Sequence, residues 1–386
     1  MTVYWYEIKK LFSSMAVWGF ISLCLMFNLF LVINSSGDPY ANFIGAVSKD
    51  TGYLLNLSFY DNLTGIKTSE EQMKWLERLK SDTDNVTDVF DDYHTSEIGE
   101  SYITASGATG SFAKIIREKY SLLQKVVDEK GKKNESLSLY FAGATYTRHQ
   151  QLFHNLMGWI LIEGILLSVL VVFLSLGYEQ SQRTQAIVYS TKKGRRILVT
   201  KLSASISMGL GAYMLLALFT LLIYFIMNDY GDIWNSNVSS IFNYRHDLIA
   251  GDRPFVTWHS FRVVTYLGAM LGLSISLILC FSLMAFGIAV LIRNDYTGFL
   301  FFIAINATIV VLPMQLPQTL TAGLYVRYYS MLTPVWLWLK HSIWFTDGDV
   351  DILWPHFETL GISVSFSALL IICGLANTYF RKRDLT

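Results

Sequence analysis

Charged residues are scarce in this chain. Lys, Arg, Asp and Glu make up 16% of its 386 residues, whereas a soluble domain typically has about a quarter. Hydrophobic residues make up 52%, so much of the surface must face something other than water. The 30 basic and 30 acidic residues balance, and no basic face stands out, which argues against a nucleic-acid-binding protein.

Residues that could bind a metal ion are also few. The three cysteines, Cys24, Cys280 and Cys373, all lie in apolar blocks, so the polar parts of the chain have no disulfide framework and no cysteine-based zinc site. The seven histidines are scattered. The closest pair, His149 and His154, is five residues apart, which would place the two rings on different faces of an α-helix. We therefore predict no metal site.

Motifs that would give the chain its own chemistry are absent. It has no Gly-x-x-x-x-Gly-Lys-Ser/Thr phosphate-binding loop, no His-Glu-x-x-His zinc motif and no Gly-x-Ser-x-Gly nucleophile turn. We therefore expect that the chain is not an enzyme, binds no cofactor directly, and does not hydrolyse a nucleotide by the phosphate-loop route.

The chain does have six apolar blocks near the roughly 20 residues needed to cross the hydrocarbon core of a bilayer. We predict membrane-spanning helices over residues 15–34, 156–176, 203–227, 264–291, 297–314 and 358–378. The first block is longer than the apolar part of a signal peptide and is followed by no small-x-small cleavage site, so we expect it to stay as an anchor. The predicted fold is an all-α polytopic membrane protein.

Two further regions precede the second span. In residues 1–14, one helical face carries Tyr4, Ile8, Leu11 and Phe12, and the charged residues lie off this face. This pattern predicts an amphipathic helix at the membrane interface; the alternative is only a basic flank of the first span. Residues 35–155 form a long polar region with helical periodicity at 69–80 and 110–130 and a Gly/Ser/Thr-rich loop at 101–110. About 120 residues suffice for a small core, so we predict a largely helical extracellular domain.

The distribution of Lys and Arg predicts the orientation. The segments 1–14, 177–202, 292–296 and 379–386 carry 12 basic residues in 53 positions, whereas 228–263 and 315–357 carry 5 in 79. Basic residues concentrate in short cytoplasmic connections, so both termini are expected in the cytoplasm. The aromatic segment within 315–357 is interrupted by Pro334 and Lys340, which favours re-entrant helices at the outer face over a seventh crossing.

A few polar side chains within the spans are candidates for a translocation path. They are Asn28, Glu163 and Asn306. An ionisable group costs a few kcal/mol in hydrocarbon, so Glu163 either lines a path or is protonated or paired with another helix. Interhelical hydrogen bonding is the simpler interpretation of the two asparagines. The Gly268–Gly272 pair predicts close packing of helices within the chain.

The segment 177–202 is the most informative. It begins with Glu179, continues as a polar helical stretch to Tyr189, turns through Ser-Thr-Lys-Lys-Gly-Arg-Arg, and reaches Lys201 as the third span begins. A loop whose basic residues merely face anionic lipid would explain the charges but not the helical stretch.

This layout resembles the membrane subunits of the type-two ABC exporter family, which typically have six spans, an amphipathic N-terminal helix and a cytoplasmic coupling helix between the second and third spans. In that family the loop commonly begins with Glu and ends with small residues, an Arg and a Lys, matched here by Glu179, Ser190–Thr191, Arg195 or Arg196, and Lys201. The short C-terminal tail at 380–385 is also similar. A departure is Lys192-Lys193-Gly194, where many members have a proline-containing turn.

The resemblance implies a permease subunit, in the plasma membrane of a bacterium, that exports a hydrophobic or amphipathic substrate such as a peptide, antibiotic or lipid. Its partners would be a separate ATP-binding subunit, which holds ATP and Mg²⁺, a second permease copy or paralogue, and membrane lipid. The residues implied to couple ATP hydrolysis to transport are Glu179, Gln182, Arg183, Tyr189, Arg195 and Lys201. The alternatives are a membrane sensor or scaffold whose outer domain binds a ligand, and an ion-coupled secondary transporter that uses Glu163.

Overall fold

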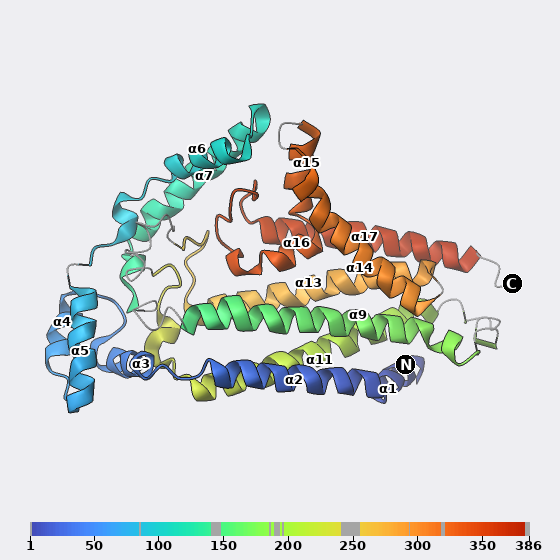
Figure 1. Cartoon of the computed structure of the whole chain (residues 1–386), viewed down its shortest axis with the longest axis horizontal. Helices are drawn as coiled ribbons and strands as arrows, with labels where there is room; N and C mark the ends of the chain where they lie inside the picture. Colours follow the sequence, from blue (N-terminus) through green and yellow to red (C-terminus); the bar gives the residue numbers. More distant parts are fainter. Residues whose placement is uncertain are drawn as a thin grey trace.

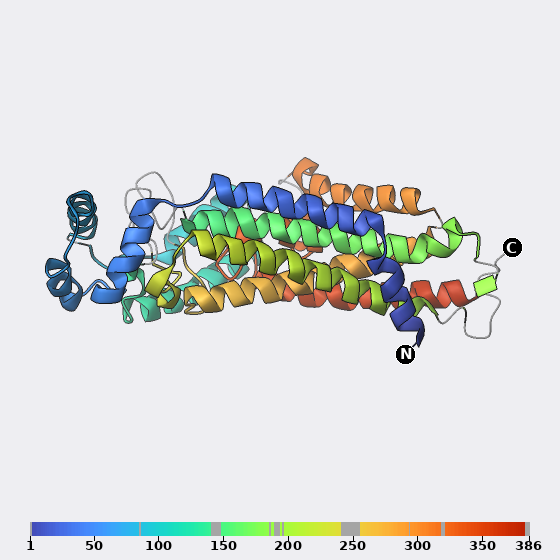
Figure 2. The same ribbon diagram turned by 90° about the horizontal axis from the view of Figure 1, so that it is seen from below.

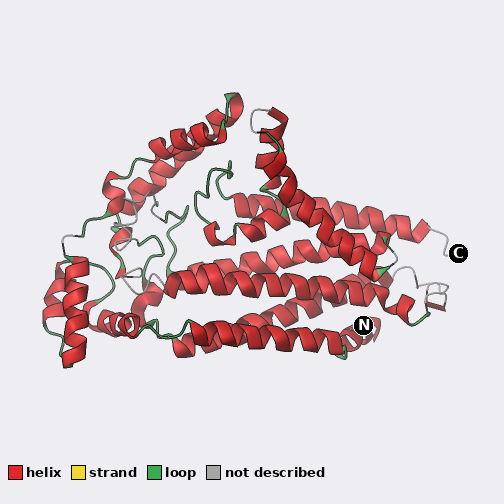
Figure 3. Ribbon diagram, viewed as in Figure 1, coloured by secondary structure: helices red, strands yellow, loops and turns green. Residues whose placement is uncertain are grey.

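The computed structural model describes residues 2–84, 86–139, 148–184, 187–188, 194, 197–240, 255–292, 294–317 and 321–382. All regular structure in these residues is helical, as Figure 3 shows, apart from three isolated bridges between single residues. Both termini lie at one end of a long helix bundle (Figures 1 and 2), which we call the terminal end; the opposite end is the distal end.

Within this described part, six helices are long and apolar enough to cross a membrane, as the sequence predicts. They are α2 (Met15–Asn34), the continuous helix Gln150–Ser181, α11 (Ile197–Met227), α13 (Val263–Leu291), α14 (Asp295–Gln315) and α17 (Phe357–Lys382). The helix Gln150–Ser181 consists of a π-helical start, η4 (Gln150–Leu156), and α9 (Met157–Ser181). The composition alone locates most span boundaries to within a few residues, because each block is bounded by polar residues.

The helix α9 lies at the centre of the bundle. It packs against α2, α11, α13 and α14, and most of its side chains are buried (Figure 1). The sides of α2, α14 and α17 that face away from α9 are apolar and exposed. A helix that is apolar all round is typical of a bundle core, and one that exposes apolar side chains over its length suits a lipid environment.

The N-terminal segment forms a separate helix, α1 (Thr2–Phe12), which turns at Ser13–Ser14 into α2. It lies across α11, as Figure 2 shows, and the Tyr4 hydroxyl donates a hydrogen bond to Ser207 Oγ at 2.8 Å. The predicted helix is confirmed, and Leu11 on its predicted apolar face is buried. The predicted faces are wrong at two positions, because Glu7 is buried against the bundle and Phe12 is exposed. The buried face is set by the packing of α1 on α11.

The polar region 35–155 has two cores. The first is formed by α3 (Pro39–Thr51), α4 (Leu57–Thr64) and α5 (Glu70–Thr83). The second lies between α7 (Gly110–Gly131) and later parts of the chain, including Trp258 and Tyr328. The predicted helices at 69–80 and 110–130 are confirmed as α5 and α7. The predicted loop at 101–110 is wrong over its first half, because α6 (Thr95–Ser106) extends to a left-handed Gly107 and pairs with α7.

A buried lysine of the second core forms hydrogen bonds with the segment 347–352 at the distal end. Lys119 of α7 is 2% exposed, and its ammonium group donates to the carbonyl oxygens of Asp347 and Ile352, both at 2.7 Å. In the first turn of α7, the centroid of the Phe112 ring lies 4.9 Å from that of the Tyr325 ring. The second half of the polar region therefore shares its core with residues 255–262 and 321–354 instead of folding independently.

The segment 315–357 contains short helices, as its interrupted pattern predicts. They are α15 (Thr321–Ser330), α16 (Pro334–Leu339) and a single 3₁₀ turn at His341–Ile343. Pro334 begins α16 at the first helical position, where a missing amide hydrogen costs nothing. None of the three is long enough to cross a membrane.

Glycines allow α9 to approach its neighbours closely, but not the pair that the sequence singles out. A Cβ at Gly164 would lie 2.5 Å from the ring of Tyr213, and one at Gly209 would lie 2.6 Å from Ser168 Oγ. At Gly268 and Gly272 no described atom lies within 4 Å. The prediction that the Gly268–Gly272 pair packs helices within the chain is therefore wrong, because this stripe faces away from the bundle.

These contacts predict opposite effects for the same substitution at two helical glycines. Gly164→Ala should lower the free energy of unfolding by about 1–3 kcal/mol, because the buried Tyr213 ring must shift. Gly272→Ala should leave it unchanged or raise it by up to about 1 kcal/mol, because alanine favours a helix and meets open space. Thermal unfolding of the two variants in the same detergent tests this, and equal destabilisation would contradict the packing described.

Candidate functional site

Four charged side chains meet at the terminal end of the bundle, where α1, α9 and α11 converge. The Lys201 ammonium group lies 2.8 Å from Glu179 Oε1 and 3.3 Å from Glu7 Oε2. The Lys10 ammonium group lies 2.5 Å from Glu7 Oε2 and 3.4 Å from Glu179 Oε1. Each lysine therefore contacts both glutamates, and we call this arrangement the ion cluster.

The ion cluster is shielded from solvent. The four side chains are between 0% and 7% exposed, with Lys201 at 0%. Lys201 also donates to the backbone oxygen of Ser175 at 2.7 Å. Burial acts to lower the pKa of Lys10, but the hydrogen bond to Glu7 and the charge of Glu179 outweigh it and raise that pKa. Two positive and two negative charges offset each other, which is the condition for keeping such groups inside a protein.

Local sequence explains how each element supplies its charge. Glu179 lies in the last turn of α9 and Lys201 in the second turn of α11, so the two helix ends face each other across the loop 182–196. Glu7 lies one turn from Tyr4 and one turn from Leu11, on the face that α1 packs against the bundle. The sequence analysis missed Glu7 and Lys10; the spacing of Tyr4, Glu7 and Leu11 was the available signal.

The predicted coupling residues are only partly brought together. Glu179 and Lys201 are in contact, but Glu179 belongs to α9 and not to a helix in the loop. Gln182 and Arg183 are exposed, and Arg183 ends the helix with a left-handed φ of 56°. Tyr189 and Arg195 lie outside the described residues.

Two of the three predicted path residues meet inside the bundle. Asn28 of α2 donates to Glu163 Oε2 of α9 at 2.7 Å and to Thr220 Oγ1 of α11 at 3.1 Å. Asn28 is 1% exposed and Glu163 6% exposed. The contact joins three helices through one asparagine, which is the interhelical hydrogen bonding that the sequence favours for Asn28. Whether a substrate passes here remains a prediction.

Asn306, the third predicted path residue, lies elsewhere. It is on α14, where its amide group donates to the Phe302 carbonyl at 2.8 Å and contacts Met284 Sδ at 3.5 Å. It therefore helps α14 pack on α13 and takes no part in the contact between Asn28 and Glu163.

The two neighbouring histidines lie on the same side of their helix. The His149 and His154 rings are 5.9 Å apart because the chain from Gln150 to Leu156 is π-helical, and its wider turn brings residues five apart onto one side. The prediction that they face different ways is wrong for this reason. His341 Nε2 lies 2.9 Å from the His154 carbonyl oxygen. Within the described ranges, no group of three or more His, Cys, Asp or Glu is arranged to hold a metal ion.

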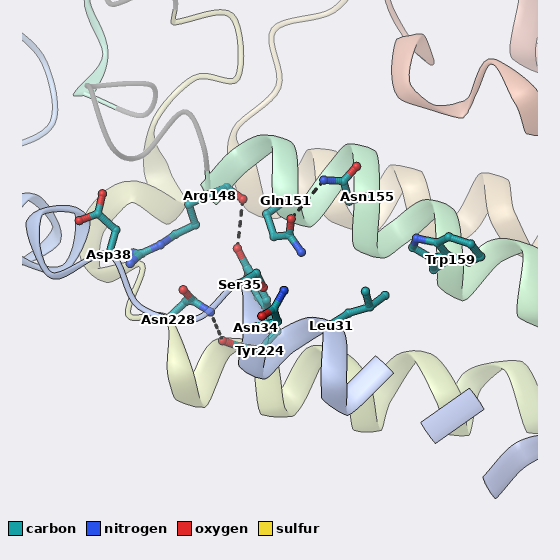
Figure 4. A pocket seen from close by; sticks show the side chains of 10 residues that line it. All are labelled: Leu31, Asn34, Ser35, Asp38, Arg148, Gln151, Asn155, Trp159, Tyr224 and Asn228. Atoms are coloured by element: carbon teal, nitrogen blue, oxygen red, sulfur yellow. Dashed lines mark hydrogen bonds between the residues drawn. The ribbon is translucent and has the colours of Figure 1, made fainter. Parts of the chain in front are cut away.

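A cavity of about 520 Å³ opens at the distal ends of α2, η4–α9 and α11 (Figure 4), and we call it the distal cavity. Its wall is rich in amide side chains, among them Asn34, Gln151, Asn155 and Asn228, and it also holds Arg148. The three residues of the Asn28 contact lie one helical turn deeper in the bundle than residues that line the cavity. Asn28 is one turn from Leu31, Glu163 is one turn from Trp159, and Thr220 is one turn from Tyr224. Polar side chains therefore continue from this cavity into the bundle.

A double-mutant cycle tests the ion cluster. Lys201→Met should lower the free energy of unfolding by roughly 3–5 kcal/mol, because it leaves buried carboxylates with one lysine. In the double variant with Lys201→Met and Glu179→Gln, the Glu7–Lys10 pair remains. The free energy of unfolding of this variant should therefore fall by roughly 0.5–3 kcal/mol less than the sum of the two single losses. Thermal unfolding of the full chain measures the cycle.

Lys9→Met, at an exposed position of α1, is the matched control and should change stability little. Strictly additive single and double effects would show that Lys201 and Glu179 do not interact.

No protein-family model, curated protein or solved structure matches this chain.

Proposed function

We propose that this chain is the permease subunit of an ATP-driven exporter of the type-two ABC family, in the plasma membrane of a bacterium. Two copies, or this chain and a paralogue, would work with two separate subunits that bind ATP and Mg²⁺. The observation that carries the proposal is the ion cluster. It joins α1, the end of α9 and the start of α11 beside the loop 182–196, so a force on that loop reaches three helices at once.

The described part of this loop supports a docking role. Gln182 and Arg183 are exposed, and Ile187 is 72% exposed. Exposed basic and apolar side chains on a short connection are suitable contacts for another protein. The ion cluster beneath would hold the helix ends rigid while the ATP-binding subunit moves the loop.

The exposed apolar helices fit the rest of the proposal. The outward sides of α2, α14 and α17 suit lipid or a second permease. The few polar groups inside the bundle and the amphipathic distal cavity suit a hydrophobic or amphipathic substrate such as a peptide, antibiotic or lipid. Both termini would lie in the cytoplasm, which places the loop 182–196 on the side where ATP is available.

Arg183→Gly is the sharpest test of this docking role. Glycine adopts a left-handed φ of 56° without strain, so the variant should keep its thermal stability while it loses the exposed guanidinium group. ATP-driven export, and co-purification with the ATP-binding subunit, should fall by about tenfold or more. Arg183→Lys, which keeps the charge, should lose less.

Arg117→Ala, which removes an exposed arginine on α7 at the distal end, is the control for a general charge effect. Normal ATP-driven export by Arg183→Gly would refute the docking role. Export that needs an ion gradient but no ATP, and that Glu163→Gln abolishes, would instead identify an ion-coupled transporter. Ligand binding without any ATPase partner would favour a sensor.

A further inference from the structure

We propose that the distal cavity binds the uncharged, hydroxyl-rich head group of a membrane glycolipid, whose acyl chains lie in the adjoining leaflet. The Lys and Arg distribution predicts this leaflet to be the outer one. Binding at this site does not depend on ATP-driven export, so it can be tested in the chain alone.

The hydrogen-bonding groups of the cavity match hydroxyl groups. Asn155 donates one hydrogen bond to Gln151 Oε1 at 3.1 Å, which leaves the Asn155 carbonyl oxygen as an acceptor and the Gln151 amide group as a donor. Asn34, on the facing helix α2, is exposed and makes no side-chain hydrogen bond to another described residue. Each sugar hydroxyl both donates and accepts, so a wall of amide groups can engage several hydroxyls of one ligand.

The charges of the cavity favour a neutral ligand. Arg148 lies in the wall, but its guanidinium group already donates to the Asp229 carbonyl at 2.8 Å and to Asn42 Oδ1 at 3.0 Å. Asp38 lies in the same wall with the opposite charge, and one of its oxygens accepts from the Tyr40 amide at 2.9 Å. The two charges offset each other, so a phosphate or an ammonium head group would gain little from entering.

An aromatic surface is available for the apolar face of a sugar ring. Trp159 lines the cavity and is 47% exposed. Its ring is held edge-to-face by Phe27 of α2, with the ring centroids 5.0 Å apart. A fixed, half-exposed indole beside several amide groups is suited to a ligand with one apolar and one hydroxyl-bearing side.

The position of the cavity supplies the lipid part of the proposal. The cavity lies at the end of an apolar span, and Phe30 and Ile33 on the adjoining part of α2 are 62% and 55% exposed. Leu31 continues this apolar surface into the wall of the cavity itself (Figure 4). A head group bound among the amides would therefore leave its acyl chains against apolar side chains of the same helix.

Native mass spectrometry of the full chain provides the test. The protein is mixed with equal amounts of a monoglucosyl diacylglycerol and the diacylglycerol with the same acyl chains. We expect the glycolipid adduct to be favoured by about tenfold or more, since the two lipids differ only in the sugar. Phosphatidylglycerol and an uncharged lipopeptide, added as competitors, should not displace it.

Variants locate the site. Asn34→Leu and Asn155→Leu each remove hydrogen-bonding groups from exposed positions, so the protein should still fold, and the preference for the glycolipid should fall several-fold in each. Asn62→Leu, at an exposed position of α4 away from the cavity, is the matched control and should keep the preference.

Three outcomes would overturn the proposal: equal binding of glycolipid and diacylglycerol, an unchanged preference in both cavity variants, or displacement of the glycolipid by the lipopeptide or by phosphatidylglycerol. None of these would bear on export, which the Arg183→Gly experiment tests separately.

Discussion

The position of Lys201 constrains the terminal end of the protein. Its ammonium group is fully buried between helices, so acidic partners must reach it from within the fold, and they come from the two neighbouring elements. One of these elements is α1, which has 11 residues and would be marginal as an isolated helix. Glu7 and Lys10 place two of its charges in the ion cluster, so their contacts with Lys201 and Glu179 help to hold α1 on the bundle.

Buried lysines also hold the distal end together. Lys119 donates hydrogen bonds to two backbone carbonyls. The ammonium group of Lys130 lies 2.8 Å from Glu135 Oε2 and 3.0 Å from Ser239 Oγ. Burial lowers the pKa of Lys130, and the charge of Glu135 opposes this effect. Both lysines belong to α7, and their partners include residues far along the chain. This helix is therefore packed into the distal connections between the long apolar helices, so the second half of region 35–155 shares its core with residues 255–262 and 321–354.

The sequence predicts features that depend on composition and local periodicity. The six long apolar helices, α5 and α7 were predictable because each has a long apolar block or a repeated apolar face. The contacts of Glu7 were not predictable from the sequence. Its partner Lys201 is 194 residues away, and a charge on a short amphipathic helix ordinarily faces water. The His149–His154 contact was also hidden, since a π-helical turn has no simple sequence pattern.

The central helix α9 carries one polar contact inside the bundle and another at its terminal end. Glu163 contacts Asn28 toward the distal end, Glu179 joins the ion cluster, and 16 residues of continuous helix, or about 24 Å, separate them. Close packing against α11, where Gly164 meets Tyr213 and Gly209 meets Ser168, restricts bending of α9 over residues 164–168. Because the helix is continuous, we expect a displacement of the segment after α9 to be transmitted along it, so that Trp159, one turn beyond Glu163, moves within the wall of the distal cavity. One continuous helix thus links the loop at which ATP-driven work is proposed to enter with the cavity at which a lipid is proposed to bind.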